Sequence, residues 1–196
     1  MDTVVHSITG YDYGDVARSP VTLEELHKLE ASASFDSRDK AALARAGRIL
    51  GPQAEAMVDG WRSKIGAQTD LAKWFFGPEG KPDDAYKAKV KPRFVRWVID
   101  LCERPFDQDW LDYQNEIGLR HTPARKNVTD HAATPSVVPL RYLIAFAAEV
   151  IVSARDVLAR ASVPPDEVDR LHAAWTKAVL LSVALWSRAY SQKDLW

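Results

Sequence analysis

A single histidine closes the segment of residues 110–121, WLDYQNEIGLRH, and imidazole is a side chain that can bind a metal. Trp110, Tyr113, Ile117 and His121 follow one another at intervals of three, four and four residues, so in a helix they share one face. Pro123 disfavours helical geometry at the residue before it. We therefore expect the helix to end at about His121, with the imidazole in the last turn on the buried side.

The spacing alone leaves two interpretations of His121. The common one is a histidine near a helix C-terminus, stabilised by the helix dipole and partly solvated beside Arg120, Arg125 and Lys126. The other is a neutral imidazole on an apolar wall, with one nitrogen on a metal and the other oriented by a backbone carbonyl. Haem is a carrier for which one such histidine suffices.

The composition predicts one soluble domain. The chain has 196 residues, 46% hydrophobic and 27% charged, and a formal net charge of -1, which gives no field to attract nucleic acid or an anionic membrane. Its one cysteine, Cys102, lies in an apolar run, where a buried reduced thiol is expected. With no signal peptide and no apolar run of about 18 residues, we expect a cytoplasmic protein without a membrane segment.

Helical spacing dominates and alternating, strand-like patterns are almost absent, which predicts an all-α fold of about eight helices. Thr22 and Glu25 form the pattern of a capping box. Pro92 lies inside a long amphipathic helix and should kink it. The helices are expected at about 22–30, 37–50, 54–66, 70–76, 83–103, 110–121, 138–161 and 165–190.

The last of these helices is apolar around most of its circumference, so it must be covered on more than one side. Leu171, Trp175, Val179 and Trp186 lie on one side, and Leu180, Val183 and Ala184 lie around another. We therefore expect a two-fold homodimer packed through the last two helices.

Several enzyme signatures are missing or incomplete. The chain has no G-x-S-x-G, no G-x-G-x-x-G after a strand and no C-x-x-C-H, so a haem would be held non-covalently. Glu24 and His27 form one Glu-x-x-His pair, whereas a di-iron bundle needs two. His6, His131 and His172 are expected in solvated roles.

Five segments together resemble one family over nearly the whole chain. They are GYDYG at 10–14, WFFGPEG at 74–80, the stretch 93–121, PLRYLIAF at 139–146 and VALWS at 183–187. The chain resembles the protoglobins, single-domain haem proteins related to the haem domains of globin-coupled sensors. The resemblance implies a globin fold at 21–196, with an N-terminal extension at 1–20 that covers the haem propionates.

The resemblance also implies the site. His121 matches the proximal iron ligand of haem b, held non-covalently, with Tyr113 and Ile117 on the same side of the porphyrin. Arg93 matches a residue near a propionate, where a charge-assisted pair makes physical sense. Val90 and Val138 should touch the ring edge. The apolar pocket on the other face, where O2, CO or NO would bind, matches Trp61, Phe75, Phe94, Leu143, Phe146 and Val150. By their types alone, these aromatic residues could equally be ordinary core.

One departure from the family concerns the distal side. Arg62 follows Trp61 where the family commonly has a tyrosine, so the usual hydroxyl donor to bound oxygen is missing. An unpaired guanidinium is costly to bury, so we expect Arg62 to turn away from the iron. Pro92 is a second departure, and it makes the path of the distal helix less predictable.

Three functions are compatible with the sequence. The first is a globin that reversibly binds diatomic gases. The second is a haem enzyme acting on NO, nitrite or peroxide, or in non-natural carbene-type chemistry, with Arg62 as an assisting polar group. The third is a helical interaction module whose aromatic residues are only core.

Overall fold

The computed structural model describes residues 8–192 and 196, and within them the only regular elements are helices. The expected all-α fold is therefore confirmed. Three short 3-10 turns, at Gly51–Gln53, Lys73–Phe75 and Arg188–Tyr190, extend or join the α-helices. The α-helices are α1 (Leu23–Ser32), α2 (Ser37–Leu50), α3 (Ala54–Gly66), α4 (Thr69–Ala72), α5 (Asp84–Glu103), α6 (Gln108–Leu119), α7 (Leu140–Ala159) and α8 (Pro165–Ser187).

Local signals set most helix starts. The Thr22 hydroxyl accepts a hydrogen bond from the Glu25 backbone, and the Glu25 carboxylate accepts one from the Thr22 backbone, which is the capping box expected from the sequence. Asp36 and Asp39 form a second capping box at α2. Asp83 and Asp107 cap α5 and α6 through single side-chain hydrogen bonds. These contacts satisfy N–H groups that a helix leaves free at its first turn.

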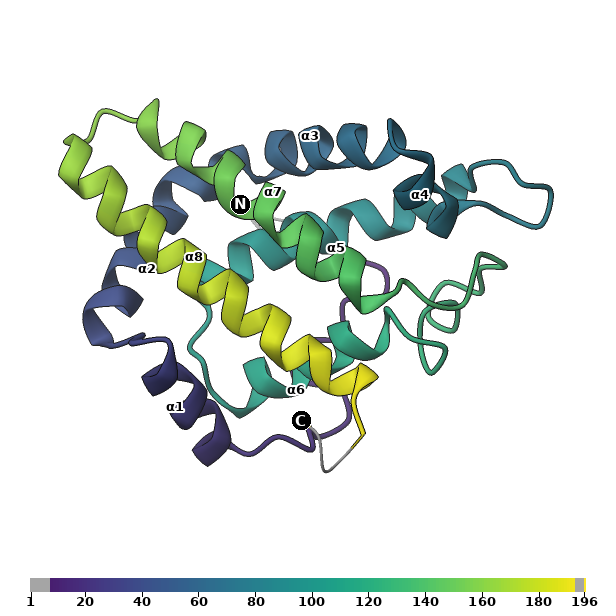
Figure 1. The fold of residues 1–196 in the computed structure, drawn as a ribbon, viewed down its shortest axis with the longest axis horizontal. Helices are drawn as coiled ribbons and strands as arrows, with labels where there is room; N and C mark the ends of the chain where they lie inside the picture. Colours follow the sequence, from purple (N-terminus) through teal and green to yellow (C-terminus); the bar gives the residue numbers. More distant parts are fainter. Residues whose placement is uncertain (1–7, 193–195) are drawn as a thin grey trace, which may run out of the picture.

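Helix α8 is the centre of the packing. It lies beside α7 and also packs against α2 and α6, so most of its apolar surface is covered within the chain (Figure 1). Leu171, Trp175 and Val179 are at most 2% exposed. This intrachain cover explains much of the apolar circumference that suggested a subunit interface. Leu180, which is 51% exposed, is not covered in this way.

Two glycines allow helices to approach closely. A side chain at Gly47 would clash with Cys102, so the absence of a Cβ lets α2 lie directly on α5. At Gly118 in α6, a Cβ would lie 3.0 Å from the Trp186 Cα in α8. This second approach fixes the distance between the helix that precedes His121 and the C-terminal half of α8.

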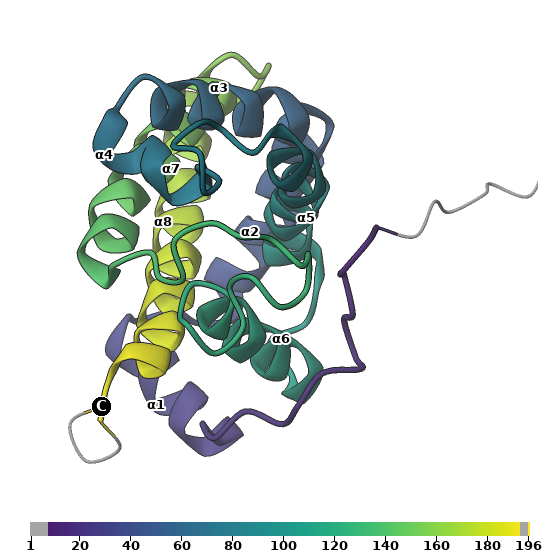
Figure 2. The same ribbon diagram turned by 90° about the vertical axis from the view of Figure 1, so that its right-hand side faces the viewer.

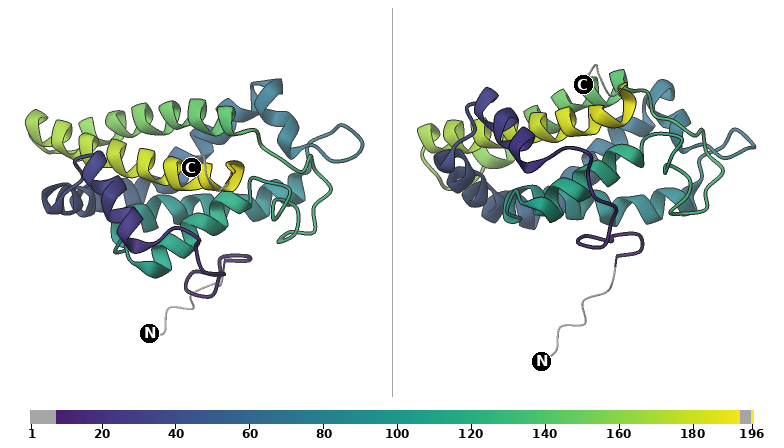
Figure 3. Two further views of the ribbon diagram at one scale, coloured as in Figure 1. Left: turned by 60° about the horizontal axis from the view of Figure 1, so that its bottom comes forward. Right: turned by 90° about the horizontal axis from the view of Figure 1, so that it is seen from below.

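The loop 120–139 joins α6 to α7 at one end of the molecule, and α4 with the turn that follows it lies near the same end (Figures 1 and 2). Residues 8–20 form an irregular segment with turns at 9–10 and 13–14, and it lies beside α6 and α5 (Figures 2 and 3). No helix of the described residues is long and apolar enough to cross a membrane.

Candidate haem site

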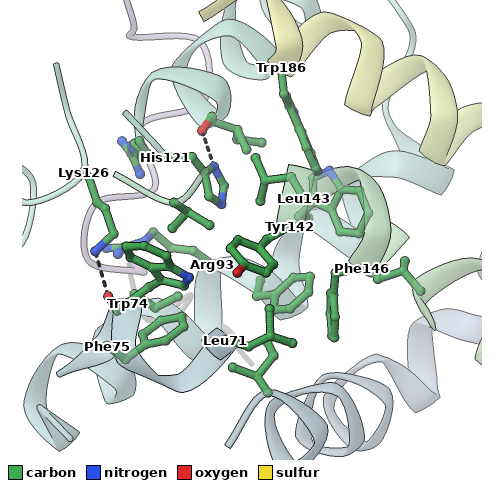
Figure 4. Close-up of a pocket in the computed structure, with 18 of the residues that line it drawn as sticks. Leu71, Trp74, Phe75, Arg93, His121, Lys126, Tyr142, Leu143, Phe146 and Trp186 are labelled. Atoms are coloured by element: carbon green, nitrogen blue, oxygen red, sulfur yellow. Dashed lines mark hydrogen bonds between the residues drawn. The ribbon is translucent and has the colours of Figure 1, made fainter. Parts of the chain in front are cut away.

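A cavity of about 250 Å³ is lined by residues of α3, α5, α6, α7 and α8 and of the loop 120–139 (Figure 4). A cavity that holds one water molecule has a volume of roughly 10–15 Å³. This cavity is much larger, so it is a site for a large group and not a packing defect. Its walls are mostly aromatic and aliphatic. The expected site residues on its lining are Phe75, Val90, Arg93, Phe94, Tyr113, Ile117, His121, Val138, Leu143, Phe146 and Val150.

His121 lies on the cavity wall just beyond α6, which ends at Leu119 and not at the histidine. Its Nδ1 is 2.8 Å from the carbonyl oxygen of Ile117. Since a carbonyl only accepts, Nδ1 carries the proton and Nε2 keeps a free lone pair. Burial lowers the pKa of His121, so the imidazole is neutral at neutral pH.

The backbone of His121 is held from two distant parts of the chain. Its carbonyl accepts the Val138 N–H at 2.9 Å and the Tyr190 hydroxyl at 3.1 Å. The ring stacks on Trp186, with centroids 6.0 Å apart. Together with the His121 N–H to Gly118 carbonyl hydrogen bond, these contacts hold the backbone and the ring of His121 in place just beyond α6.

The face that the spacing of α6 predicted is only partly realised. Tyr113, Ile117 and His121 line the cavity together. Trp110 does not line it, because its fully buried ring stacks on Phe106 with centroids 3.9 Å apart. Trp110 therefore belongs to the core at the other end of α6.

Aromatic and aliphatic side chains from α5 and α7 form the opposite wall. Phe94 and Phe146 face the cavity, as expected from the resemblance. Trp61 does not reach the lining: its indole packs against Phe94, with centroids 5.3 Å apart, and its N–H donates to the Ser153 hydroxyl at 2.7 Å. Trp61 thus supports this wall from behind.

Arg62 turns its guanidinium away from this wall. The group donates to the Lys87 carbonyl oxygen at 3.2 Å and lies 3.8 Å from Asp59, which is the direction expected for an arginine without an anion in the pocket. The interpretation of Arg62 as an assisting group in an enzyme gains no support from this position.

Apart from Arg62, the lysine, arginine and aspartate side chains on the cavity lining lie at one edge, beside the loop 120–139. Arg93 from α5 forms a two-pronged ion pair with Asp130 of the loop, with Nη1 and Oδ1 3.0 Å apart. Arg120 pairs with Glu116 at 2.9 Å. Lys126 also reaches this edge (Figure 4). The resemblance placed Arg93 near a propionate, and the structure adds that Asp130 already orients its guanidinium.

The N-terminal segment crosses this charged edge. Arg93 donates to the Thr9 carbonyl oxygen at 2.9 Å, and Arg120 donates to that of Gly10. Gly10 has a φ of 72°, and a Cβ there would lie 2.6 Å from the Arg93 Nη1, so only glycine fits. The ring of Tyr11 packs on Tyr113 with centroids 5.3 Å apart. Residues 9–11 therefore lie against three residues of the cavity lining, namely Arg93, Tyr113 and Arg120.

Sequence reasoning missed several lining residues. Trp186 lies on α8, close to Gly118. It belongs to another helix than the pattern 110–121, so helical spacing could not connect it to His121. Asp130 and Lys126 sit in an irregular loop, where there is no periodicity to read. The cavity-lining residues that were not expected as site residues are Arg62, Ile65, Leu71, Trp74, Tyr86, Trp97, Arg120, Lys126, Thr129, Asp130, Tyr142, Ala147, Val179, Val183 and Trp186.

The donor set fits the haem that the resemblance implies. The described residues contain no group of three His, Cys, Asp or Glu side chains that could hold a metal ion alone, whereas haem iron needs one protein imidazole. His121 supplies it, apolar walls suit a porphyrin face, and cations at one edge suit its carboxylates. The buried indole N–H of Trp74, on the cavity lining, has no acceptor among the described residues.

Comparisons with known proteins agree with this geometry. The family model described as Protoglobin matches residues 22–196. The fold is similar to the globin domain of Geobacter sulfurreducens globin-coupled sensor, with a TM-score of 0.68 and 15% sequence identity, over 85% of this chain and 97% of that one. No curated protein matches the sequence.

Proposed function

The chain belongs to the protoglobin family, and from this premise we propose that it binds haem b non-covalently, with His121 as the iron ligand, and that it reversibly binds O2, CO and NO. Bound haem supplies a ferrous iron that can take a diatomic gas. The observation that carries the proposal is the geometry of His121. Its Nδ1–H donates a hydrogen bond to the Ile117 carbonyl oxygen. The neutral ring therefore keeps Nε2 as the nitrogen that can bind iron.

The walls support gas binding over other uses of the haem. Phe94, Phe146, Leu143 and Val150 offer neither acids nor bases near the centre of the cavity, so they exclude water and disfavour charge separation there. Arg62 reaches the cavity lining, but its guanidinium is engaged by the Lys87 carbonyl oxygen. These positions favour reversible binding over reaction of the bound gas.

We also propose the domain division 1–20 and 21–196, with the first segment covering the propionates. The contacts of Thr9 and Gly10 with Arg93 and Arg120 support this role for the described part of the segment. A reducing cytoplasmic location is supported by the single, buried Cys102.

A homodimer through α7 and α8 is part of the proposal. The large exposed apolar side chains of the described residues include Ile144 and Val152 on α7 and Leu180 on α8, each more than half exposed. A surface of this kind is typical of an interaction site. Light scattering is expected to give twice the chain mass at micromolar concentration. A Val152→Lys variant should shift it to monomer, and a wild-type protein that is monomeric throughout would contradict the dimer.

The test of haem binding compares two histidine variants. The purified wild-type protein should show a Soret band that CO shifts in the ferrous state. His121→Gly should lose most of this haem, and added imidazole should restore it by taking the place of the missing ring. His27 is exposed on α1, so His27→Ala should leave the spectrum unchanged. Normal haem binding and spectrum in the His121→Gly protein without imidazole would refute the assignment.

A further inference from the structure

Lys126 is a buried lysine at the charged edge of the cavity. It lies in the loop 120–139, five residues after His121, and is 4% exposed. Lysine is almost never buried to this extent unless its charge is paired. Figure 4 shows its side chain reaching from the loop toward Trp74 on the same side of the cavity as Arg93.

The partners of Lys126 are all neutral. Its Nζ donates to the Trp74 carbonyl oxygen at 2.9 Å and to the Thr134 hydroxyl at 2.7 Å, and it lies 5.1 Å from the centre of the Tyr86 ring. An ammonium group has three N–H donors. Two are accounted for by these hydrogen bonds, so one N–H and the full positive charge remain.

The other lysine or arginine side chains that line the cavity have carboxylates. Arg62 lies near Asp59, Arg93 is paired with Asp130, and Arg120 is paired with Glu116. Among the described residues, no carboxylate lies within 4.0 Å of the Lys126 Nζ. Burial lowers the pKa of Lys126 to about 8, as expected for an ammonium group without a carboxylate partner.

We propose that Lys126 binds a carboxylate of the group that fills the cavity, which under the proposed function is one of the two haem propionates. The residue is well placed for this role because its Nζ is already held by the Trp74 carbonyl oxygen and the Thr134 hydroxyl, so little side-chain entropy is lost when the ion pair forms. Arg93, oriented by Asp130, remains available for the other carboxylate. The inference rests on the proposed function and adds a residue that neither spacing nor the family resemblance singled out.

The test combines a variant of the lysine with a variant of the cofactor. Wild-type protein and Lys126→Met are each loaded with haem or with haem dimethyl ester, whose carboxylates are neutral. Dissociation of each cofactor is then followed by its transfer to an excess of a second haem-binding protein. Lys126→Gln is a second variant, because its amide can still donate to Trp74 while carrying no charge. Lys81 is an exposed loop lysine, so Lys81→Met is the matched control.

We expect Lys126→Met and Lys126→Gln to release haem faster by about tenfold or more, the scale of a hydrogen bond between charged groups. The ester should leave the variants and the wild type at rates within about twofold. Equal acceleration for haem and ester would mean that Lys126 only supports the loop, and would overturn the inference. Unchanged haem release would overturn it as well. A wild-type protein that retains no haem would instead refute the proposed function. This outcome differs from the two that overturn the role of Lys126, because both of those require a wild-type protein that binds haem.

Discussion

The contact of α6 with α8 at Gly118 gives a quantitative prediction for Gly118→Ala. A Cβ there would lie 3.0 Å from the Trp186 Cα and 3.1 Å from its carbonyl oxygen. Carbon atoms normally pack about 3.5–4.0 Å apart, so the two helices must separate by a few tenths of an ångström. Both partners at the contact belong to the backbone, so no side-chain rotation can relieve it.

The expected magnitude is the balance of two effects. Alanine gains at most about 1 kcal/mol over glycine in helix propensity, and overpacking costs about 1–3 kcal/mol. Gly118→Ala should therefore lower the free energy of unfolding by up to about 2 kcal/mol. Gly60, on the exposed side of α3, has nothing within 4 Å of its Cβ position, so Gly60→Ala should raise the same free energy by about 0.5–1 kcal/mol.

Chemical unfolding of the two variants beside the wild type measures this difference. The separation of α6 from α8 should also loosen the stacking of Trp186 on His121, so haem should leave Gly118→Ala faster than it leaves Gly60→Ala. If Gly118→Ala stabilises the protein as much as Gly60→Ala does, the close approach of the helices is refuted.

Three further predictions concern single side chains. Arg62→Tyr restores a hydroxyl donor and should slow oxygen dissociation by about tenfold or more, with little change for CO; a stopped-flow oxygen rate that stays equal or rises would show that Arg62 itself contacts the gas. Burial raises the pKa of the Cys102 thiol to about 12, so a thiol reagent should label it only in denaturant, and fast labelling of the native protein would contradict its burial. The pKa of Lys126 is about 8 in the folded protein freed of cofactor and 10.5 in the unfolded chain. Between these two pH values the unfolded chain binds more protons than the folded one, so the free energy of unfolding should rise with pH across this range. In Lys126→Met the free energy of unfolding should rise less between pH 8 and 10.5 than in the wild type. The same pH dependence in both proteins would count against a buried, titrating Lys126.

Local chemistry in the sequence determined most of the helices. The expected bounds of α2 and α3 match the structure, because Asp36 caps α2 from its own neighbours and Gly51 with Pro52 separates the two helices. The capping box at Thr22 is also a contact between residues three apart. Signals of this range are fully contained in the sequence, so they can be read before the chain is folded.

The end of α6 was expected at about His121, two residues beyond its observed end, and the contacts that hold His121 there are not local. Pro123 predicted a helix up to His121, whereas α6 ends at Leu119. Val138 and Tyr190, 17 and 69 residues further along, hold the His121 carbonyl. The spacing could place His121 on the face of Tyr113 and Ile117, but not show which nitrogen faces the cavity.

The charged edge of the site was decided by the tertiary structure alone. The resemblance pointed to Arg93, but its ion pair with Asp130 spans 37 residues and reaches into a loop without periodicity. Lys126 has only neutral hydrogen-bond partners among the described residues. This depends on how α5, α6, the loop and the N-terminal segment pack together. Helical spacing fixes neighbours within one or two turns, whereas the balance of charge around a cavity is a sum over distant segments, so it exists only once the chain is packed.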